Sequence, residues 1–247
     1  MPKSITGGLG TVAIRMPSHP VAAQLIRTSG VYIAAPSANI SGKPSPTRGE
    51  HVIHDMKGRI DMIIVDDTVD IGVESTIVDL SEDVPTILRP GYITKEMLEE
   101  VLGEEVRIDP GIIASDSTKK PKAPGMKYRH YAPKADLSIV EGPQDEVIAC
   151  INRLTREAAS TGLKTGIIAT DETKDQYADG LVLSIGSREE EETIAHHLYG
   201  VLRDFDEAQV NVIYSEAFYT PRMGQAIMNR LLKAAGHKII KTQEEEK

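Results

Sequence analysis

Residues 31–47 read VYIAAPSANISGKPSPT, in which an apolar run passes into a loop of hydroxyl, amide, proline and glycine residues. The unbroken apolar run at 31–35 predicts a short buried strand. Thr47, followed three residues later by Glu50, predicts a capping box and hence the start of a helix. The loop would then leave the carboxyl end of a strand, where open α/β sheets bind their ligands. Turn formation alone also selects Pro, Ser, Asn and Gly, so this loop does not establish a site by itself.

Apolar runs and helix signals alternate on both sides of this loop. A helix is predicted from an N-cap at Ser18, through Pro20 in its first turn, to Gly30. Thr94 caps a second helix that ends at Gly103. Further strands are predicted at residues 11–15, 62–65, 76–80 and 86–88. We therefore predict that residues 1–108 form a partial α/β domain built on a twisted open sheet.

Residues 109–134 contain four prolines and two glycines and show neither a helical nor a strand period. We interpret them as a linker, because long connections without secondary structure are usually functional covers or tethers. Beyond the linker, apolar runs at 137–140, 165–169, 181–185 and 210–214 alternate with helical segments at 144–160, 189–207 and 222–235. This alternation predicts that residues 135–247 form a smaller three-layer, parallel, Rossmann-like α/β domain.

The composition narrows the class of protein. The chain has 247 residues, a net charge of −9 and a hydrophobic content of 40%, which is enough for two modest cores. The negative charge argues against a general polyanion binder. The single cysteine, Cys150, excludes an internal disulfide, fits a reducing cytoplasm and lies on an apolar helical face. No apolar run is long enough to span a bilayer, so we expect no membrane association.

The two histidine pairs of the chain do not have the pattern of a metal site. His51 lies near His54, and His196 precedes His197, but neither pair has the further ligands of a metal site in its neighbourhood. We therefore expect no protein metal site.

Four elements associated with predicted strands offer hydroxyls and guanidinium groups. GTVAIR (10–15) places Thr11 and Arg15 on one strand face, GVESTIVD (72–79) carries Ser75, and ILRPG (87–91) carries Arg89 on a turn. Together with the loop at 35–47, and in this order, they resemble the YrdC-like threonylcarbamoyl-AMP synthase family in its longer form. PGMKYRHYAP (124–133) resembles the interdomain linker of that form, and GQAIMNRL (224–231) resembles its final helix.

The resemblance implies an enzyme, a nucleotidyltransferase that joins L-threonine, bicarbonate and ATP to threonylcarbamoyl-AMP and releases pyrophosphate. The product would pass to the tRNA threonylcarbamoyl transferase machinery, for N6-threonylcarbamoyladenosine in tRNA. Such a reaction brings two anionic reactants together, so the site works by positioning and fixed positive charge rather than by covalent catalysis. No catalytic residue is assigned. Mg²⁺ is expected with ATP, held mostly by phosphate oxygens and water.

By motif match, the resemblance assigns the ligand contacts. The threonine contacts are Arg15, Ser37 and Ser75. The ATP contacts are Thr11, the backbone of Ala35, Ser45, Arg89, and His130 with Tyr131 from a linker that covers the nucleotide. Asn39 either orients its loop or contacts ligand. Taken singly, each of these residues also fits an ordinary structural role at a strand end or a turn.

Two features depart from the family pattern. Members begin with a larger N-terminal part that carries a Lys/Arg-Pro signature, and nothing before Ile5 supplies it, so the chain looks like the C-terminal two-thirds of such a protein and is expected to turn over poorly. Asp66-Asp67-Thr68 stands where a glycine-rich turn is usual. The alternative is a truncated, non-catalytic fragment that binds nucleotide or RNA. The basic linker has few aromatic residues on which bases could stack, so we expect at most a weak contact with RNA.

Overall fold

The computed structural model describes residues 6, 8–66, 69–112 and 132–242. Its helices are α1 (Pro20–Ser29), α2 (Gly49–Met56), α3 (Lys95–Leu102), α4 (Gln144–Ser160), α5 (Glu191–Glu207) and α6 (Gly224–Ala234), with short 3₁₀ turns η1 (Pro110–Ile112) and η2 (Lys174–Gln176). Its strands are β1 (Ile77–Asp79), β2 (Thr86–Arg89), β3 (Arg107–Ile108), β4 (Asp136–Glu141), β5 (Thr165–Ala169), β6 (Leu181–Ser184), β7 (Val212–Glu216) and β8 (Ile239–Lys241).

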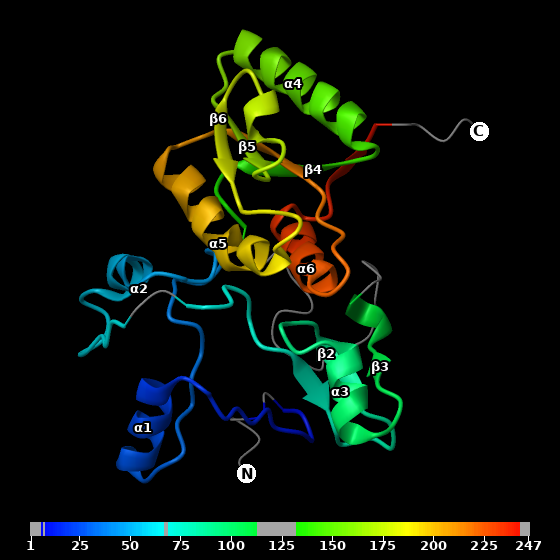
Figure 1. Cartoon of the computed structure of the whole chain (residues 1–247). Coiled ribbons are helices and arrows are strands. Elements are labelled where there is room, and N and C mark those ends of the chain that lie inside the picture. Colours follow the sequence, from blue (N-terminus) through cyan, green and yellow to red (C-terminus); the bar gives the residue numbers. More distant parts are fainter. Residues whose placement is uncertain (1–5, 7, 67–68, 113–131, 243–247) are drawn as a thin grey trace.

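The C-terminal half is a five-stranded, wholly parallel sheet with the order β6-β5-β7-β4-β8. Helix α4 covers one face, and α5 and α6 cover the other (Figure 1). Side chains divide between the faces by the strand period of two, so Ile139 joins the core under α5 and α6 while Val140 joins the core under α4. The predicted three-layer parallel α/β architecture is confirmed, and β8 is an added edge strand that the sequence did not indicate.

The N-terminal half contains a small mixed sheet with the order β1-β2-β3, in which β1 and β2 are antiparallel and β2 and β3 are parallel. The strands predicted at 76–80 and 86–88 are therefore present. The strands predicted at 11–15, 31–35 and 62–65 are wrong, because the structure gives these segments no strand pairing. Their side chains are exposed, apart from that of Ile63, which is partly buried; Ile14 has 88% and Tyr32 106% relative exposure. A strand needs a neighbouring ladder, and the described residues supply none there.

Helix starts follow local chemistry, with two corrections. The N-cap of α1 is His19 rather than Ser18, with Pro20 at the first helical position as expected. The N-cap of α2 is Arg48 rather than Thr47, and His51 Nδ1 accepts from the backbone N–H groups of Thr47 at 3.2 Å and Arg48 at 3.3 Å. An imidazole nitrogen therefore takes the capping role that the pattern assigned to Glu50.

Helix α3 begins and ends as predicted. Thr94 accepts from the backbone N–H of Met97, and Gly103 adopts the left-handed conformation that closes a helix.

The N-terminal segments rest on α5 through buried charge. Arg203 Nη2 donates to Asp55 Oδ2 at 2.9 Å, and Lys43 Nζ donates to Asp55 Oδ1 at 2.9 Å. Burial raises the pKa of the Asp55 carboxyl, but hydrogen bonds from Arg203, His54 and Lys43 outweigh it and hold that pKa well below its usual range. Nearby, burial lowers the pKa of His51 to about 4, and the charges of Arg203 and Arg48 act in the same direction. The predicted loop at 35–47 is thus anchored at its end by the C-terminal half.

The predicted division at residues 108 and 134 stays a prediction. Most of the linker, including His130 and Tyr131, lies outside the described residues, and β4 begins at Asp136. None of the described helices is both long and apolar enough to cross a membrane.

Candidate functional site

Two residues predicted to share one ligand meet in the structure. Arg15 Nη2 donates a hydrogen bond of 2.9 Å to Ser75 Oγ, although 60 positions separate them in the chain. Both residues are exposed. A guanidinium carries five N–H donors in a planar fork, and this bond uses one of them. The pair therefore presents charged donors beside a hydroxyl, which suits a small zwitterion with a carboxylate.

A third segment contacts this pair through the backbone of Ser75. Arg89 Nε donates to the carbonyl oxygen of Ser75 at 3.1 Å. Gly91 explains how the chain at 89–91 approaches so closely, because a side chain at this position would place its Cβ 2.7 Å from the carbonyl oxygen of Glu74. Arg15, Ser75 and Arg89, drawn from three separate sequence motifs, therefore form one cluster.

The remaining predicted contacts lie around this cluster with different exposure. Ser45 is buried and donates its hydroxyl to Glu74 Oε1 at 2.7 Å. Thr11, Ala35 and Ser37 are exposed, and among the described residues no hydrogen bond joins them to the cluster. Their ligand roles stay predictions.

Asn39 organises the loop at 35–47. Its Nδ2 donates to the carbonyl oxygens of Ile40 at 2.9 Å and Lys43 at 3.2 Å. Of the two roles left open for Asn39, orienting the loop is the one for which the structure provides contacts.

Three charged residues of the site, Glu74, Arg230 and Lys233, were missed by the sequence reasoning. Glu74 accepts from Ser45 and lies directly before Ser75. Burial, together with the positive charges of Arg230 and Arg89, lowers the pKa of Lys233, on α6, to about 8. Only the tertiary fold brings α6 to this place, so no local pattern marks Lys233. Arg89, Arg230 and Lys233 together give the cluster a surplus of positive charge, which favours anionic ligands.

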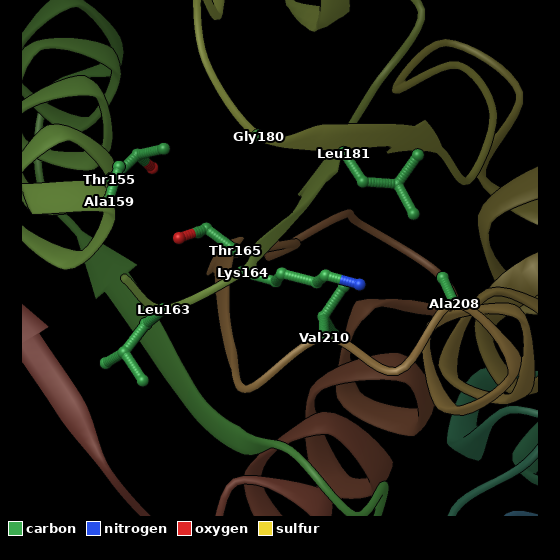
Figure 2. Close-up of a pocket in the computed structure, with 9 residues that line it drawn as sticks. All are labelled: Thr155, Ala159, Leu163, Lys164, Thr165, Gly180, Leu181, Ala208 and Val210. Carbon is green, nitrogen blue, oxygen red and sulfur yellow. The ribbon is translucent and has the colours of Figure 1, made fainter. Parts of the chain in front are cut away.

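The structure has one cavity near this cluster and another far from it. One of about 380 Å³ is lined by Asp70, Ile71 and Tyr92 from the segments that flank the cluster, and by Glu192 and Met223 from the C-terminal half. The other, of about 290 Å³, lies at the amino ends of β5 and β6 beside α4 (Figure 2). Parallel sheets bind ligands at the opposite, carboxyl edge, so the second cavity is not the candidate site. Among the described residues, no group of three or more His, Cys, Asp or Glu side chains could hold a metal ion.

Two family models match the chain. Residues 93–236 match the model described as threonylcarbamoyl-AMP synthase, C-terminal domain. Residues 1–91 match the model described as telomere recombination.

Curated relatives agree with these matches. The threonylcarbamoyl-AMP synthase of Bacillus subtilis is 50% identical over 237 residues, which are 96% of this chain and 66% of the relative. That of Pyrococcus abyssi is 47% identical over 241 residues, which are 98% of this chain and 68% of the relative. The chain thus spans about two thirds of the length of these relatives.

Two solved structures of Pyrococcus abyssi Sua5 superpose on the chain. The complex with L-threonine gives a TM-score of 0.88 at 46% identity and covers 97% of this chain and 68% of the other. The second structure, of a variant in which a histidine and the tyrosine that follows it are replaced by alanine, gives a TM-score of 0.89 at 46% identity, with 97% and 67% coverage.

Proposed function

This chain belongs to the threonylcarbamoyl-AMP synthase family, and we propose that it supplies the threonine and nucleotide sites of an enzyme that makes threonylcarbamoyl-AMP. The substrates are L-threonine, bicarbonate and ATP, and pyrophosphate is released. The product serves N6-threonylcarbamoyladenosine formation in tRNA and passes to a tRNA threonylcarbamoyl transferase. The single cysteine of the chain suits the cytoplasm as the compartment.

The observation that carries this proposal is the hydrogen bond of 2.9 Å between Arg15 and Ser75, with Arg89 bonded to the Ser75 carbonyl. Arg15 binds the threonine carboxylate by its planar fork, and Ser75 orients the amino acid, together with Ser37. The crystal structure of a relative 46% identical in complex with L-threonine supports threonine as the amino acid.

The nucleotide lies against the positive side of the cluster. Arg89 binds phosphate oxygens, with Thr11, Ser45 and the backbone at Ala35 completing the contacts. Fixed cations stabilise the anionic α-phosphate as the carbamate attacks it, so the protein contributes charge and alignment rather than a nucleophile.

Glu74 is the acidic residue of the site, so we ask whether its carboxylate is available as a Mg²⁺ ligand. The carboxylate of Glu74 already accepts from Ser45, Tyr199 and Arg230, so it does not serve as a vacant ligand. Mg²⁺ therefore comes with ATP, and phosphate oxygens and water hold it.

The linker supplies the remaining nucleotide contacts. This chain contains one His-Tyr dipeptide, His130–Tyr131, and the structure of a relative has been solved with a histidine and the following tyrosine both replaced by alanine. We assign His130 and Tyr131 to the face of the nucleotide that the linker covers.

The test separates the two ligands by calorimetric titration. We expect Arg15→Ala to weaken L-threonine binding about ten- to hundredfold, since a charge-assisted hydrogen bond contributes about 1.5–3 kcal/mol, and to change ATP binding little. Arg89→Ala does the reverse. Arg27→Ala removes an exposed cation from α1 and serves as the matched control, with both affinities unchanged. Equal losses of both ligands in both site variants would contradict the assignment.

Turnover is tested separately by pyrophosphate release, with each of the three substrates omitted in turn. Synthase activity requires release that depends on L-threonine and bicarbonate. Binding of threonine and ATP without such release would identify a non-catalytic ligand-binding chain.

A further inference from the structure

Arg230 is a charged residue of α6 that the reaction leaves unexplained. It lies in the motif GQAIMNRL (224–231) and is 1% exposed, which makes it one of the largest fully buried side chains. Burying a guanidinium costs free energy unless its donors are paired. The fold therefore retains Arg230 at a cost that its partners have to offset.

Two of the three residues that accept hydrogen bonds from Arg230, Glu74 and Pro90, lie outside the C-terminal half. Nε donates to Glu74 Oε2 at 2.9 Å, and Nη2 donates to the backbone oxygen of Glu74 at 3.0 Å. Nη1 donates to the backbone oxygen of Pro90 and, at 3.4 Å, to that of Ala226 in its own helix. One rigid planar group thus joins α6 to two separate segments of the N-terminal half.

These acceptors are the chain neighbours of two predicted ligand contacts. Glu74 directly precedes Ser75, and Pro90 directly follows Arg89. Because a carbonyl oxygen belongs to the peptide plane that carries the next residue, fixing it fixes the direction of that residue's backbone. The Glu74 oxygen therefore fixes the peptide plane that carries Ser75. The Pro90 oxygen lies in the plane that carries Gly91, and the proline ring, which locks φ of Pro90, ties Arg89 to that plane. Arg230 therefore constrains the relative placement of Ser75 and Arg89.

Glu74 extends the same network to a third contact. Its carboxylate accepts from Ser45 Oγ at 2.7 Å and from Tyr199 Oη, on α5, at 3.0 and 3.1 Å. Burial raises the pKa of Glu74, but the charge of Arg230 and the hydrogen bond from Ser45 outweigh it and lower that pKa. The hydroxyl hydrogen of Ser45 is thereby committed to Glu74, so Ser45 can only accept from a ligand while this bond holds.

Arg203 holds the other side of Ser45 in the same way. Its Nε and Nη2 donate to the backbone oxygen of Pro44 at 3.1 and 2.6 Å. Side chains of α5 and α6 therefore donate hydrogen bonds to a chain neighbour of each predicted contact. These neighbours are Pro44 beside Ser45, Glu74 beside Ser75, and Pro90 beside Arg89.

We propose that Arg230 and Tyr199 are positioning residues for the ligand site, and that the C-terminal half holds Ser45, Ser75 and Arg89 in their binding arrangement through Glu74 and Pro90. They act through these two neighbours and not by contact with substrate. The ligand part of this inference rests on the proposed function.

The experiment uses Arg230→Met in the whole chain, which keeps most of the volume and removes the donors. The matched control is Ile151→Ala, which opens the core under α4 on the opposite face of the sheet. The first readout is amide hydrogen exchange, which needs no ligand. We expect Arg230→Met to raise exchange at least tenfold at residues 74–76 and 89–91 relative to β5 and β7, and Ile151→Ala to leave this ratio unchanged.

The second readout is the affinity for L-threonine by calorimetry. We expect Arg230→Met to weaken it at least tenfold and Tyr199→Phe, which removes one hydroxyl and preserves packing, to weaken it two- to fivefold. Arg230→Lys should fall between wild type and Arg230→Met, because a single ammonium cannot reach all the acceptors of a guanidinium. Tyr199→Phe keeps the test valid if Arg230→Met folds poorly.

The outcomes separate the two claims. Unchanged local exchange in Arg230→Met overturns the positioning role, as does wild-type threonine affinity in both Arg230→Met and Tyr199→Phe. If the wild-type chain binds no threonine while Arg230→Met still loosens 74–76 and 89–91, the proposed function fails and the structural positioning stands.

Discussion

Ile14 and Ile139 both lie in short apolar runs, but their surroundings differ between the two halves of the molecule. Ile14 is 88% exposed in a segment without strand pairing, whereas Ile139 is fully buried in β4, between β7 and β8. The difference shows that an apolar run becomes a strand only when neighbours satisfy its backbone and a second layer covers its side chains. Burial is a property of the assembly of elements and not of the run.

The contact between the halves gives the largest expected effect. Asp55→Ala leaves Arg203 buried without its carboxylate, and removing one partner of a buried ion pair costs about 3–5 kcal/mol. We expect this loss in the free energy of unfolding, measured by urea titration with far-UV circular dichroism. Glu157→Ala, which breaks an exposed ion pair with Arg153 on α4, is the control and should have no measurable effect. If Asp55→Ala, like Glu157→Ala, left the free energy of unfolding unchanged, the halves would not stabilise each other through this contact.

A matched pair of substitutions tests the comparison directly. Ile139→Ala removes buried methyl groups and leaves a cavity, so it should cost about 2–5 kcal/mol of unfolding free energy. Ile14→Ala should stay within about 0.5 kcal/mol, as exposed substitutions do. The same urea titration measures both. A large loss for Ile14→Ala would show that the apolar run at 11–15 is covered in solution.

Acid should act more gradually, through His51 where the halves meet. Its pKa is about 4 in the folded chain against 6.5 for an ordinary histidine. Between these values the unfolded chain binds a proton that the folded chain does not, so stability present above pH 6.5 is lost as the pH falls toward 4. The slope from this group is at most about 1.4 kcal/mol per pH unit. His51→Gln cannot titrate and should flatten the profile in this window; an equally steep profile would assign the acid sensitivity to other groups.

The sequence predicted the C-terminal half well because its signals are long and redundant. The expected segments at 165–169 and 144–160 coincide with β5 and α4. Strands β4, β6 and β7 are followed by the amphipathic helices α4, α5 and α6, so the strand pattern and the helix pattern agree there. Strand β8, with three residues, is too short to give a periodic signal.

The candidate site was predicted only in part. Arg15 and Ser75 were expected at one ligand, and the structure brings them within hydrogen-bond distance. Glu74 and Arg230 were missed, because 156 positions separate them and nothing local marks either as a buried charge. The apolar runs at 31–35 and 62–65 misled for the opposite reason: their local pattern is sound, but the partners that a strand requires are not among the described residues.

The order of the parallel sheet has a consequence for synthesis of the chain. Strand β7 lies between β4 and β5, so these two earlier strands do not pair with each other. They are joined into one sheet only after residues 212–216 have been synthesised. Helix α6 follows later still, and with it Arg230, which donates to Glu74. On the ribosome, the residues proposed to bind substrate are made early, but Glu74 and Pro90 meet Arg230 only when nearly the last segment has left the exit tunnel. A premature stop before residue 224 would therefore release a polypeptide that contains Arg15, Ser75 and Arg89 but lacks the helix that aligns two of them.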